Sequence, residues 1–150
     1  GMVIHYHNRS KLDSGKENGA IYHKTLESLM SVSDVLSVCC PASKETINLI
    51  NKKTISLLPN GAIVTNVARG DIVDDDALIE ALDSKKVSAV GLDVYKNEPK
   101  LNPGYLKHSR AFVLPHLGSA TFETRTAMAN LAIDNISEFF ETGSCKNKVN

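Results

Sequence analysis

The fold is decided by residues 62–94, which read AIVTNVARGDIVDDDALIEALDSKKVSAVGLDV. Runs of Val, Ile, Ala and Leu open and close this stretch, at residues 62–67 and 87–94, and are typical of buried β-strands. Between them, three aspartates precede an apolar segment, and two lysines follow it, which predicts a helix whose end charges suit its dipole. Strand, helix and strand in this order predict a parallel pair joined by a crossover helix.

Further elements are predicted on both sides of this unit. Their expected ranges are strands at residues 3–7, 34–40 and 111–115 and helices at residues 25–31, 51–58 and 121–140. Because the strand runs are apolar rather than alternating, we expect parallel strands with helices on both faces of the sheet. We also expect the last helix to face the core with an apolar side made of Met128, Leu131, Ala132, Ile136 and Phe139.

Composition excludes several classes of protein. A chain of 150 residues with 42% apolar and 23% charged residues matches one folded domain. Seventeen basic and seventeen acidic residues cancel, so we predict neither nucleic acid nor a membrane surface as partner. No apolar run approaches the roughly 20 residues that cross a bilayer, and no secretory signal is visible. Three cysteines without paired spacing favour a reducing compartment, and we expect the cytoplasm.

Two sets of potential metal ligands have simpler explanations. The aspartates at positions 74–76 suit the first turn of the predicted helix, where acids are favoured without any ion. His5 and His7 share one face of a predicted strand, but no third ligand is in view, so packed or edge positions are favoured. We therefore predict no metal site.

Polar side chains follow three of the predicted strands. Arg69, Asp93 and His116 each come after an apolar run, and ligands of parallel sheets bind at the carboxyl ends of the strands. Taken singly, they could be a surface cation, a turn carboxylate and an ordinary loop histidine. Taken together, they include a group that exchanges a proton and a group that holds a carboxylate, which the reduction of a 2-oxo acid requires.

The chemistry of each residue type supports this interpretation. The planar guanidinium of Arg69 can hold a carboxylate through two parallel hydrogen bonds. His116 can donate a proton to a carbonyl oxygen and take it back, provided that a carboxylate supports the imidazolium. Glu98 is the candidate carboxylate; Glu123 is an alternative, although an acid in a first helical turn is the favoured explanation for it.

Three ordered motifs carry a family resemblance. The segments NVARG at 66–70, GLDVY at 91–95 with Glu98 and Pro99 after it, and PHLGSAT at 115–121 resemble the D-isomer-specific 2-hydroxyacid dehydrogenases. The resemblance covers essentially the whole chain. It implies a Rossmann-type, doubly wound parallel α/β sheet that lacks its first strand-turn-helix.

The same resemblance implies roles for individual residues. His116 is implied as proton donor and acceptor, Glu98 as its partner, and Arg69 as the group that binds the carboxylate and carbonyl of the substrate. The coenzyme would be bound by Asp93, at the nicotinamide carboxamide, and by the backbone around Cys40, Pro41, Val67, Ala68, Gly118 and Ser119.

The residues after the first strand predict which coenzyme is preferred. NAD-specific folds usually carry an acidic residue there, which binds the ribose hydroxyls. This chain has Asn8, Arg9 and Ser10 instead. Because Arg9 can pair with a 2′-phosphate and Ser10 can donate a hydrogen bond to it, we predict a preference for NADP, with NAD possible.

The resemblance also bears on domain organisation. Residues 1–150 contain no GxGxxG segment and no separate substrate domain. We therefore expect a partial NAD(P)-binding domain, the C-terminal piece of a roughly twofold longer enzyme that forms a homodimer. By itself, the chain is expected to bind coenzyme weakly and to turn over little substrate.

Three functions remain open at this point. The first is an oxidoreductase that reduces a small 2-oxo acid such as glyoxylate or hydroxypyruvate, with phosphoglycerate-type or branched substrates as alternatives. The second is a coenzyme-sensing binding protein similar to the family's corepressors. The third is an inactive fragment.

Overall fold

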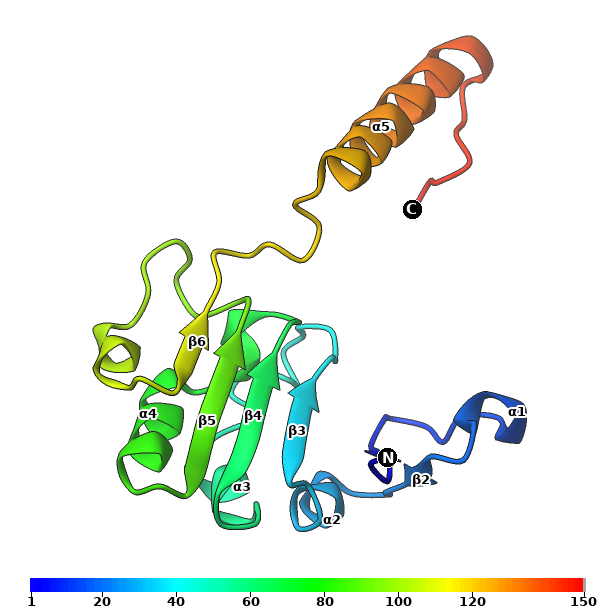
Figure 1. The fold of residues 1–150 in the computed structure, drawn as a ribbon. Coiled ribbons are helices and arrows are strands. Elements are labelled where there is room, and N and C mark those ends of the chain that lie inside the picture. Colours follow the sequence, from blue (N-terminus) through cyan, green and yellow to red (C-terminus); the bar gives the residue numbers. More distant parts are fainter. Residues whose placement is uncertain (150) are drawn as a thin grey trace. The chain divides into compact units, whose positions relative to one another are not determined.

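The computed structural model describes residues 1–149, and the chain divides into two units, Gly1–Pro115 and His116–Asn150. The centre of the first unit is a parallel sheet in the order β3 (Val35–Val38), β4 (Ala62–Asn66), β5 (Val87–Leu92) and β6 (Ala111–Val113), shown in Figure 1. These strands lie within the predicted ranges. The parallel α/β fold is confirmed.

The helices of the first unit begin where capping residues predict. α2 (Leu26–Met30) begins after Thr25, and α4 (Asp75–Asp83) begins after Asp74, whose carboxylate accepts from the Ala77 amide at 3.2 Å. Short 3₁₀-helices η1 (Gly70–Ile72) and η2 (Pro103–Lys107) lie in the loops after β4 and before β6.

α3 (Lys52–Ser56) has a complete capping box. The side chain of Asn51 accepts hydrogen bonds from the backbone amides of Lys53 and Thr54. The Thr54 hydroxyl in turn accepts from the Asn51 amide at 2.8 Å. Three backbone amides at the start of α3 thereby have partners within the capping box.

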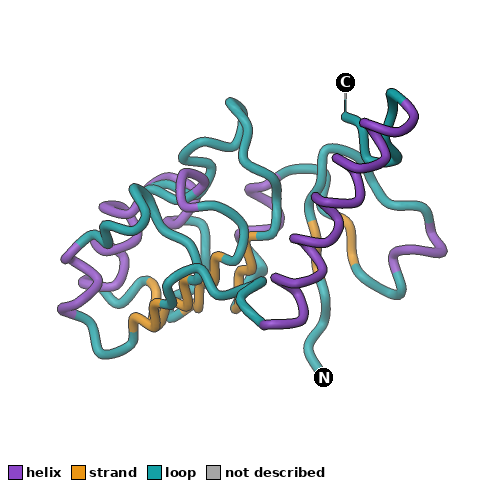
Figure 2. The backbone as a smooth tube through the Cα atoms, turned by 90° about the horizontal axis from the view of Figure 1, so that it is seen from above, coloured by secondary structure: helices purple, strands orange, loops and turns teal. Residues whose placement is uncertain are grey.

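Strand register separates the two faces of the four-stranded sheet. On one face, Leu36, Val64 and Val90 pair across neighbouring strands and are all buried. Three helices of the first unit, α2, α3 and α4, lie on this side (Figure 2) and add Met30, Ile55 and Leu78 to the same core. On the other face, Val35, Ile63 and Phe112 stay exposed. Within the first unit, helices therefore cover one face of the sheet, where the sequence predicted both.

A small parallel pair precedes this sheet. β1 (His5–Tyr6) pairs with β2 (Ile21–Tyr22), and α1 (Ser14–Glu17) lies between them in sequence. His5 Nδ1 lies 2.8 Å from His23 Nε2, and His7 Nδ1 lies 2.9 Å from the His23 carbonyl oxygen. Both histidines thus have protein partners at the positions predicted to be structural.

The second unit consists of α5 (Phe122–Thr142) with a short segment on either side. The helix begins after Thr121, which accepts from the Thr124 amide at 3.1 Å, and it ends at Gly143 with φ 75°. No residue of α5 is buried. The predicted core face is therefore wrong for this unit, because the unit contains no second element that could cover it. Its large side chains are more than half exposed, namely Met128, Leu131, Ile136 and Phe139.

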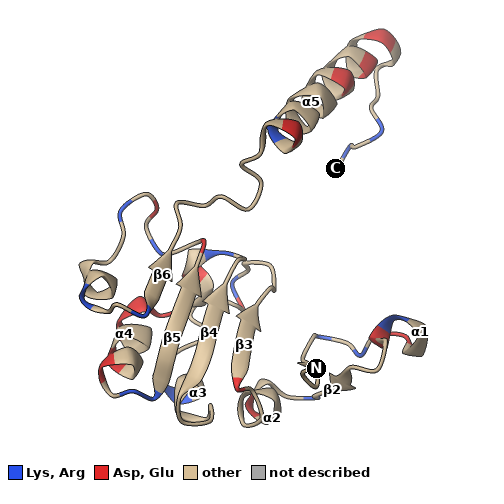
Figure 3. Ribbon diagram, in the orientation of Figure 1, with Lys and Arg blue, Asp and Glu red and all other residues tan. Residues whose placement is uncertain are grey.

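In the first unit, basic and acidic side chains are interspersed rather than gathered on one element (Figure 3). Among the described residues, no helix has both the length and the apolar character needed to cross a bilayer.

Candidate active site

The candidate residues of the first unit follow strand ends that lie in one row of the sheet. Val38, Asn66, Leu92 and Val113 are paired from strand to strand, and each is the last residue of its strand. Because the strands are parallel, the loops after them leave the same edge of the sheet. These loops carry the predicted residues Cys40, Pro41, Val67, Ala68, Arg69, Asp93 and Glu98.

The remaining candidates follow β6 and belong to the second unit. His116 has φ 57°, a left-handed backbone conformation that is uncommon outside glycine. His116, Gly118 and Ser119 are all exposed. The structure sets the candidates that follow β3, β4 and β5 on loops at one edge of the sheet, whereas the meeting of His116 with Arg69 and Glu98 is a proposal.

Asn66 organises the turn that carries Arg69. Its side chain is 1% exposed; Oδ1 accepts from the Ala68 amide at 3.0 Å and Nδ2 donates to the Arg69 carbonyl at 2.9 Å. The Asn66 carbonyl also accepts from the Asp93 amide at 3.0 Å. One buried amide therefore shapes the loop after β4, and its backbone joins that loop to the end of β5.

Arg69 itself is an exposed side chain on this turn. Its Nη1 donates to the Ala68 carbonyl at 2.6 Å. A guanidinium carries several N–H donors in one plane, and an exposed one can present two of them to a carboxylate. The backbone of Arg69 is thus held by Asn66, while its side chain lies at the surface where a small acid could reach it.

Gly70 brings the loops after β4 and β5 into direct contact. It is buried, and a Cβ at this position would collide with the backbone carbonyl of Tyr95. The Tyr95 amide donates to Glu98 Oε1 at 3.1 Å. Arg69 and Glu98 therefore lie on two adjoining loops, one next to Gly70 and the other bonded through Tyr95.

Asp93 differs from Arg69 and Glu98 in its burial. Its residue is 9% exposed and follows the last residue of β5. A carboxylate at this depth suits a ligand with an N–H donor, such as a carboxamide. Val67 beside it on the neighbouring loop is 60% exposed, so this edge also offers accessible backbone. The Asp93 carboxylate is a hydrogen-bond acceptor and fits the N–H donors of a nicotinamide carboxamide.

The loop after β3 carries two of the expected coenzyme residues. Cys40 is half-buried and packs against the core, and burial raises the pKa of its thiol. Pro41 is exposed, and its carbonyl accepts from the Thr46 hydroxyl at 2.9 Å. The pKa of Glu45 in the same loop is lowered, mainly by its hydrogen bond from Ser43.

The residues predicted to select the coenzyme follow β1. Asn8, Arg9 and Ser10 are all exposed. Arg9 is close enough to Glu45 to add a smaller electrostatic contribution to the lowered pKa of that carboxyl, after the Ser43 hydrogen bond.

Two contributors were not predicted from the sequence. Asn66 and Gly70 both stand in the NVARG motif, but neither was assigned a role. A polar residue at the end of an otherwise apolar strand is a usable signal for Asn66, because a buried amide needs partners. No local sequence signal predicts the role of Gly70, because the residue that it contacts, Tyr95, lies on another loop.

Comparisons with known proteins identify the family and agree with the fold. The sequence model of the "D-isomer specific 2-hydroxyacid dehydrogenase, NAD binding domain" matches residues 1–118. The 4-methyl-2-oxopentanoate reductase A of Aspergillus oryzae is 39% identical over 143 residues, which make up 95% of this chain and 43% of that protein.

Two solved structures are similar over nearly the whole chain. A glyoxylate reductase from Paecilomyes thermophila has a TM-score of 0.91 at 41% identity, over 99% of this chain and 45% of that one. An NADPH-dependent glyoxylate/hydroxypyruvate reductase from Sinorhizobium meliloti, in complex with NADP and malonate, has a TM-score of 0.91 at 35% identity, over 97% of this chain and 45% of that one. The chain spans less than half the length of each of these relatives.

Proposed function

Because the chain belongs to the D-isomer-specific 2-hydroxyacid dehydrogenase family, we propose that it is the coenzyme-binding part of an oxidoreductase that reduces a small 2-oxo acid to a D-2-hydroxy acid. The observation that carries this proposal is the contact between Gly70 and the Tyr95 backbone. It sets Arg69 and Glu98 on adjoining loops at the carboxyl edge of the sheet. These are the carboxylate-binding and the proton-supporting groups that such a reduction needs.

In the proposed mechanism, each side chain has one task. Arg69 binds the carboxylate of the substrate through two N–H donors and thereby orients the adjacent carbonyl. His116 donates a proton to the carbonyl oxygen, and Glu98 stabilises the imidazolium before the transfer. A nicotinamide coenzyme, when bound, supplies the hydride. Asp93 would hold its carboxamide, and the backbone around Cys40, Pro41, Val67, Ala68, Gly118 and Ser119 would line the nucleotide.

Coenzyme oxidation by the complete protein tests this function. A panel of glyoxylate, hydroxypyruvate, phosphohydroxypyruvate and branched 2-oxo acids should include at least one substrate that is reduced in the presence of NADPH or NADH. Arg69→Lys should raise KM more than it lowers kcat, because an ammonium cannot form the paired contact. Coenzyme binding without oxidation, for every acid in the panel, would instead favour a coenzyme-sensing binding protein.

The NADP preference has its own test. Arg9→Ala should lower kcat/KM for NADPH by about tenfold, since one charge-assisted hydrogen bond is lost, and should leave NADH within about twofold. Lys11→Ala is the matched control, because Lys11 is an exposed cation two residues away that pairs with Glu17 at 3.6 Å. Equal effects of Arg9→Ala on the two coenzymes would refute the preference.

The domain and assembly proposals follow the same family membership, and the compartment proposal follows the cysteine content. We propose that residues 1–150 are part of a longer enzyme and that the complete protein is a cytoplasmic homodimer. Intact mass and sedimentation velocity of the protein isolated from its source decide the first two points, and cell fractionation decides the third. A monomer at micromolar concentration would contradict the dimer.

A further inference from the structure

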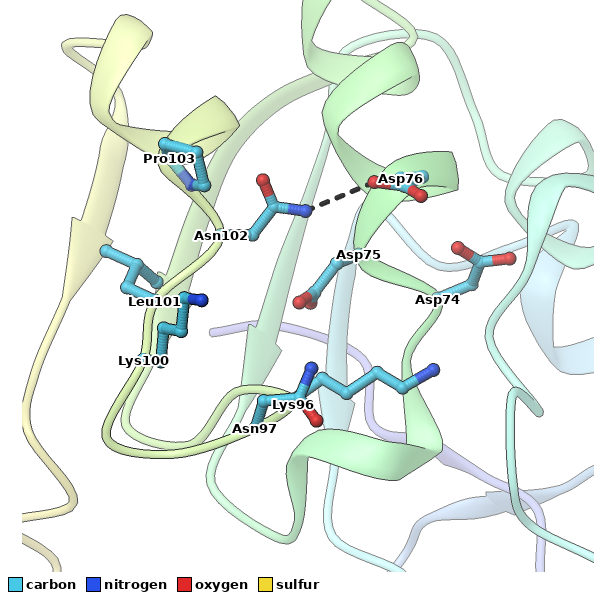
Figure 4. A pocket seen from close by; sticks show the side chains of 9 residues that line it. All are labelled: Asp74, Asp75, Asp76, Lys96, Asn97, Lys100, Leu101, Asn102 and Pro103. Atoms are coloured by element: carbon cyan, nitrogen blue, oxygen red, sulfur yellow. Dashed lines mark hydrogen bonds between the residues drawn. The ribbon is translucent and has the colours of Figure 1, made fainter.

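The loop that carries Glu98 has almost no burial of its own. Residues 96–100 are all exposed, whereas Tyr95 before them is 9% exposed and Tyr105 after them is 1% exposed. A pocket of about 530 Å³ lies between residues 96–103 of this loop and the first turn of α4 (Figure 4). Exposed side chains from residues 96–100 therefore line this pocket, whereas the parts that pack against the core are Tyr105 and, before it, the partly buried Leu101.

The downstream end is held by a buried hydrogen bond. The Tyr105 hydroxyl donates to Asp75 Oδ1 at 2.8 Å, although the two residues are 30 positions apart. Asp75 is 8% exposed, and burial raises the pKa of both its carboxyl and the Tyr105 hydroxyl. Buried polar groups are costly to leave without partners, so each residue depends on the other.

Two further contacts fix the same end of the loop on α4. Asn102 Nδ2 donates to Asp76 Oδ1 at 3.1 Å, as Figure 4 shows, and Asn102 Oδ1 accepts from the Gly104 amide at 3.0 Å. Gly104 lies so close to Ile79 that a Cβ would come within 2.5 Å of Ile79 Cδ1. The start of η2 thus packs against the first two turns of α4. The Tyr105–Asp75 hydrogen bond is the buried contact between these two elements.

We propose that Asp75 and Tyr105 are positioning residues for Glu98. Their hydrogen bond holds the downstream end of the loop 96–103, while Gly70 and Tyr95 hold the upstream end. Glu98 lies between the two anchors, so movement of the downstream anchor would shift the loop that carries it. We call the Tyr105–Asp75 hydrogen bond the clamp. Its role in catalysis rests on the proposed function, whereas its effect on the loop 96–103 does not.

The first test uses the complete protein and needs no activity. Hydrogen exchange of residues 96–103 and tryptic cleavage after Lys96 and Lys100 should both be about tenfold faster in Tyr105→Phe, because the buried bond no longer opposes opening. Exchange in β4 and β5 should change much less, which separates loop release from general unfolding. Unchanged exchange and cleavage in the loop would overturn the clamp.

Conservative variants identify the hydrogen bond as the cause. Asp75→Asn keeps an oxygen that accepts from the Tyr105 hydroxyl and should protect the loop to within about twofold of the wild type, whereas Asp75→Ala should release it. Tyr6→Phe is the matched control, because the Tyr6 hydroxyl donates to Glu17 at 2.6 Å in a different part of the chain. It should leave exchange in the loop 96–103 unchanged. Equal release by Asp75→Asn and Asp75→Ala would refute the role of the bond.

The second test asks whether the clamp acts through Glu98 in the complete protein. A displaced Glu98 supports the His116 imidazolium less, so the pH above which reduction declines should fall by about half a unit in Tyr105→Phe. Glu98→Gln should move the profile in the same direction, and Asp75→Asn should leave it unchanged. A released loop with an unshifted profile would refute the positioning role. Absence of any 2-oxo acid reduction would refute the proposed function, and the exchange data would still decide the clamp.

Discussion

Gly70→Ala should destabilise the chain, because the new methyl group meets backbone that cannot move aside. The atoms in its way are the carbonyl carbon and oxygen of Tyr95. Overpacking of this kind costs about 1–3 kcal/mol, and a rigid neighbour places it towards the upper end. Replacing glycine also lowers the entropy of the unfolded chain, which returns about 0.4–1 kcal/mol. We therefore expect a net loss of about 2 kcal/mol in the free energy of unfolding.

The chain contains a matched glycine for this experiment. A Cβ at Gly91 would lie 3.5 Å from Thr65 Cγ2, which is an ordinary van der Waals contact. Gly91→Ala should therefore be neutral or stabilise by up to about 1 kcal/mol. Urea unfolding followed by circular dichroism measures both variants, with the slope checked for constancy. Equal stabilities of the two variants, within about 0.5 kcal/mol, would refute the argument that the loops after β4 and β5 meet at Gly70.

Three further predictions concern single side chains. Asn66→Ala should cost about 2 kcal/mol and speed amide exchange at Ala68, since two hydrogen bonds to the turn are lost; unchanged exchange would contradict this. Asn51→Ala should cost about 1 kcal/mol in urea unfolding, because the capping box of α3 is removed, and no loss would contradict it. The raised pKa of Tyr105 means that the folded state keeps a proton that the unfolded state loses above about pH 10, so stability should fall as the pH rises beyond that value. Tyr105→Phe should show a smaller fall than the wild type, because the raised pKa of Tyr6 contributes in the same direction. Equal falls in the two proteins would contradict the burial of the Tyr105 hydroxyl.

The hydrophobic pattern predicted where the main strands lie but not which faces of the sheet are covered by helices. The apolar runs around Val64 and Val90 are strong local signals, and both strands formed as predicted. Whether a helix covers the other face, where Val35 and Ile63 remain exposed, depends on which elements are available to pack there and not on the strand sequence. The two-residue strand Ile21–Tyr22 is too short to give a periodic signal at all.

In the helices, too, nearby residues determine where a helix begins, whereas distant residues determine which side chains are buried. The aspartates before α4 were explained as a first turn, and Asp74 is indeed its capping residue. Asp75, however, is buried and accepts a hydrogen bond from Tyr105. The two residues are 30 positions apart, so no local sequence pattern predicts this contact. The apolar side of α5 was assigned to the core from its spacing, but spacing specifies which residues share a face and not what that face contacts.

The candidate site was proposed from residues whose side-chain chemistry is distinctive, and their roles remain a prediction. Arg69 and Glu98 were selected because their side chains suit the reaction, and the structure places them on adjoining loops. Asn66 and Gly70 act on the backbone around them, so their roles became visible only once the strands were paired. Residues that do chemistry can be recognised by type, whereas residues that position them require the fold.

The central claim is that Arg69 and His116 flank one substrate. The most direct measurement is a crystal structure of the complete protein with NADPH and oxamate, an unreactive analogue of a 2-oxo acid. We expect the Arg69 guanidinium to donate hydrogen bonds to the carboxylate of oxamate and the His116 imidazole to donate one to its amide carbonyl oxygen, each at about 2.7–3.2 Å. Oxamate bound with His116 on the far side of the protein would contradict it.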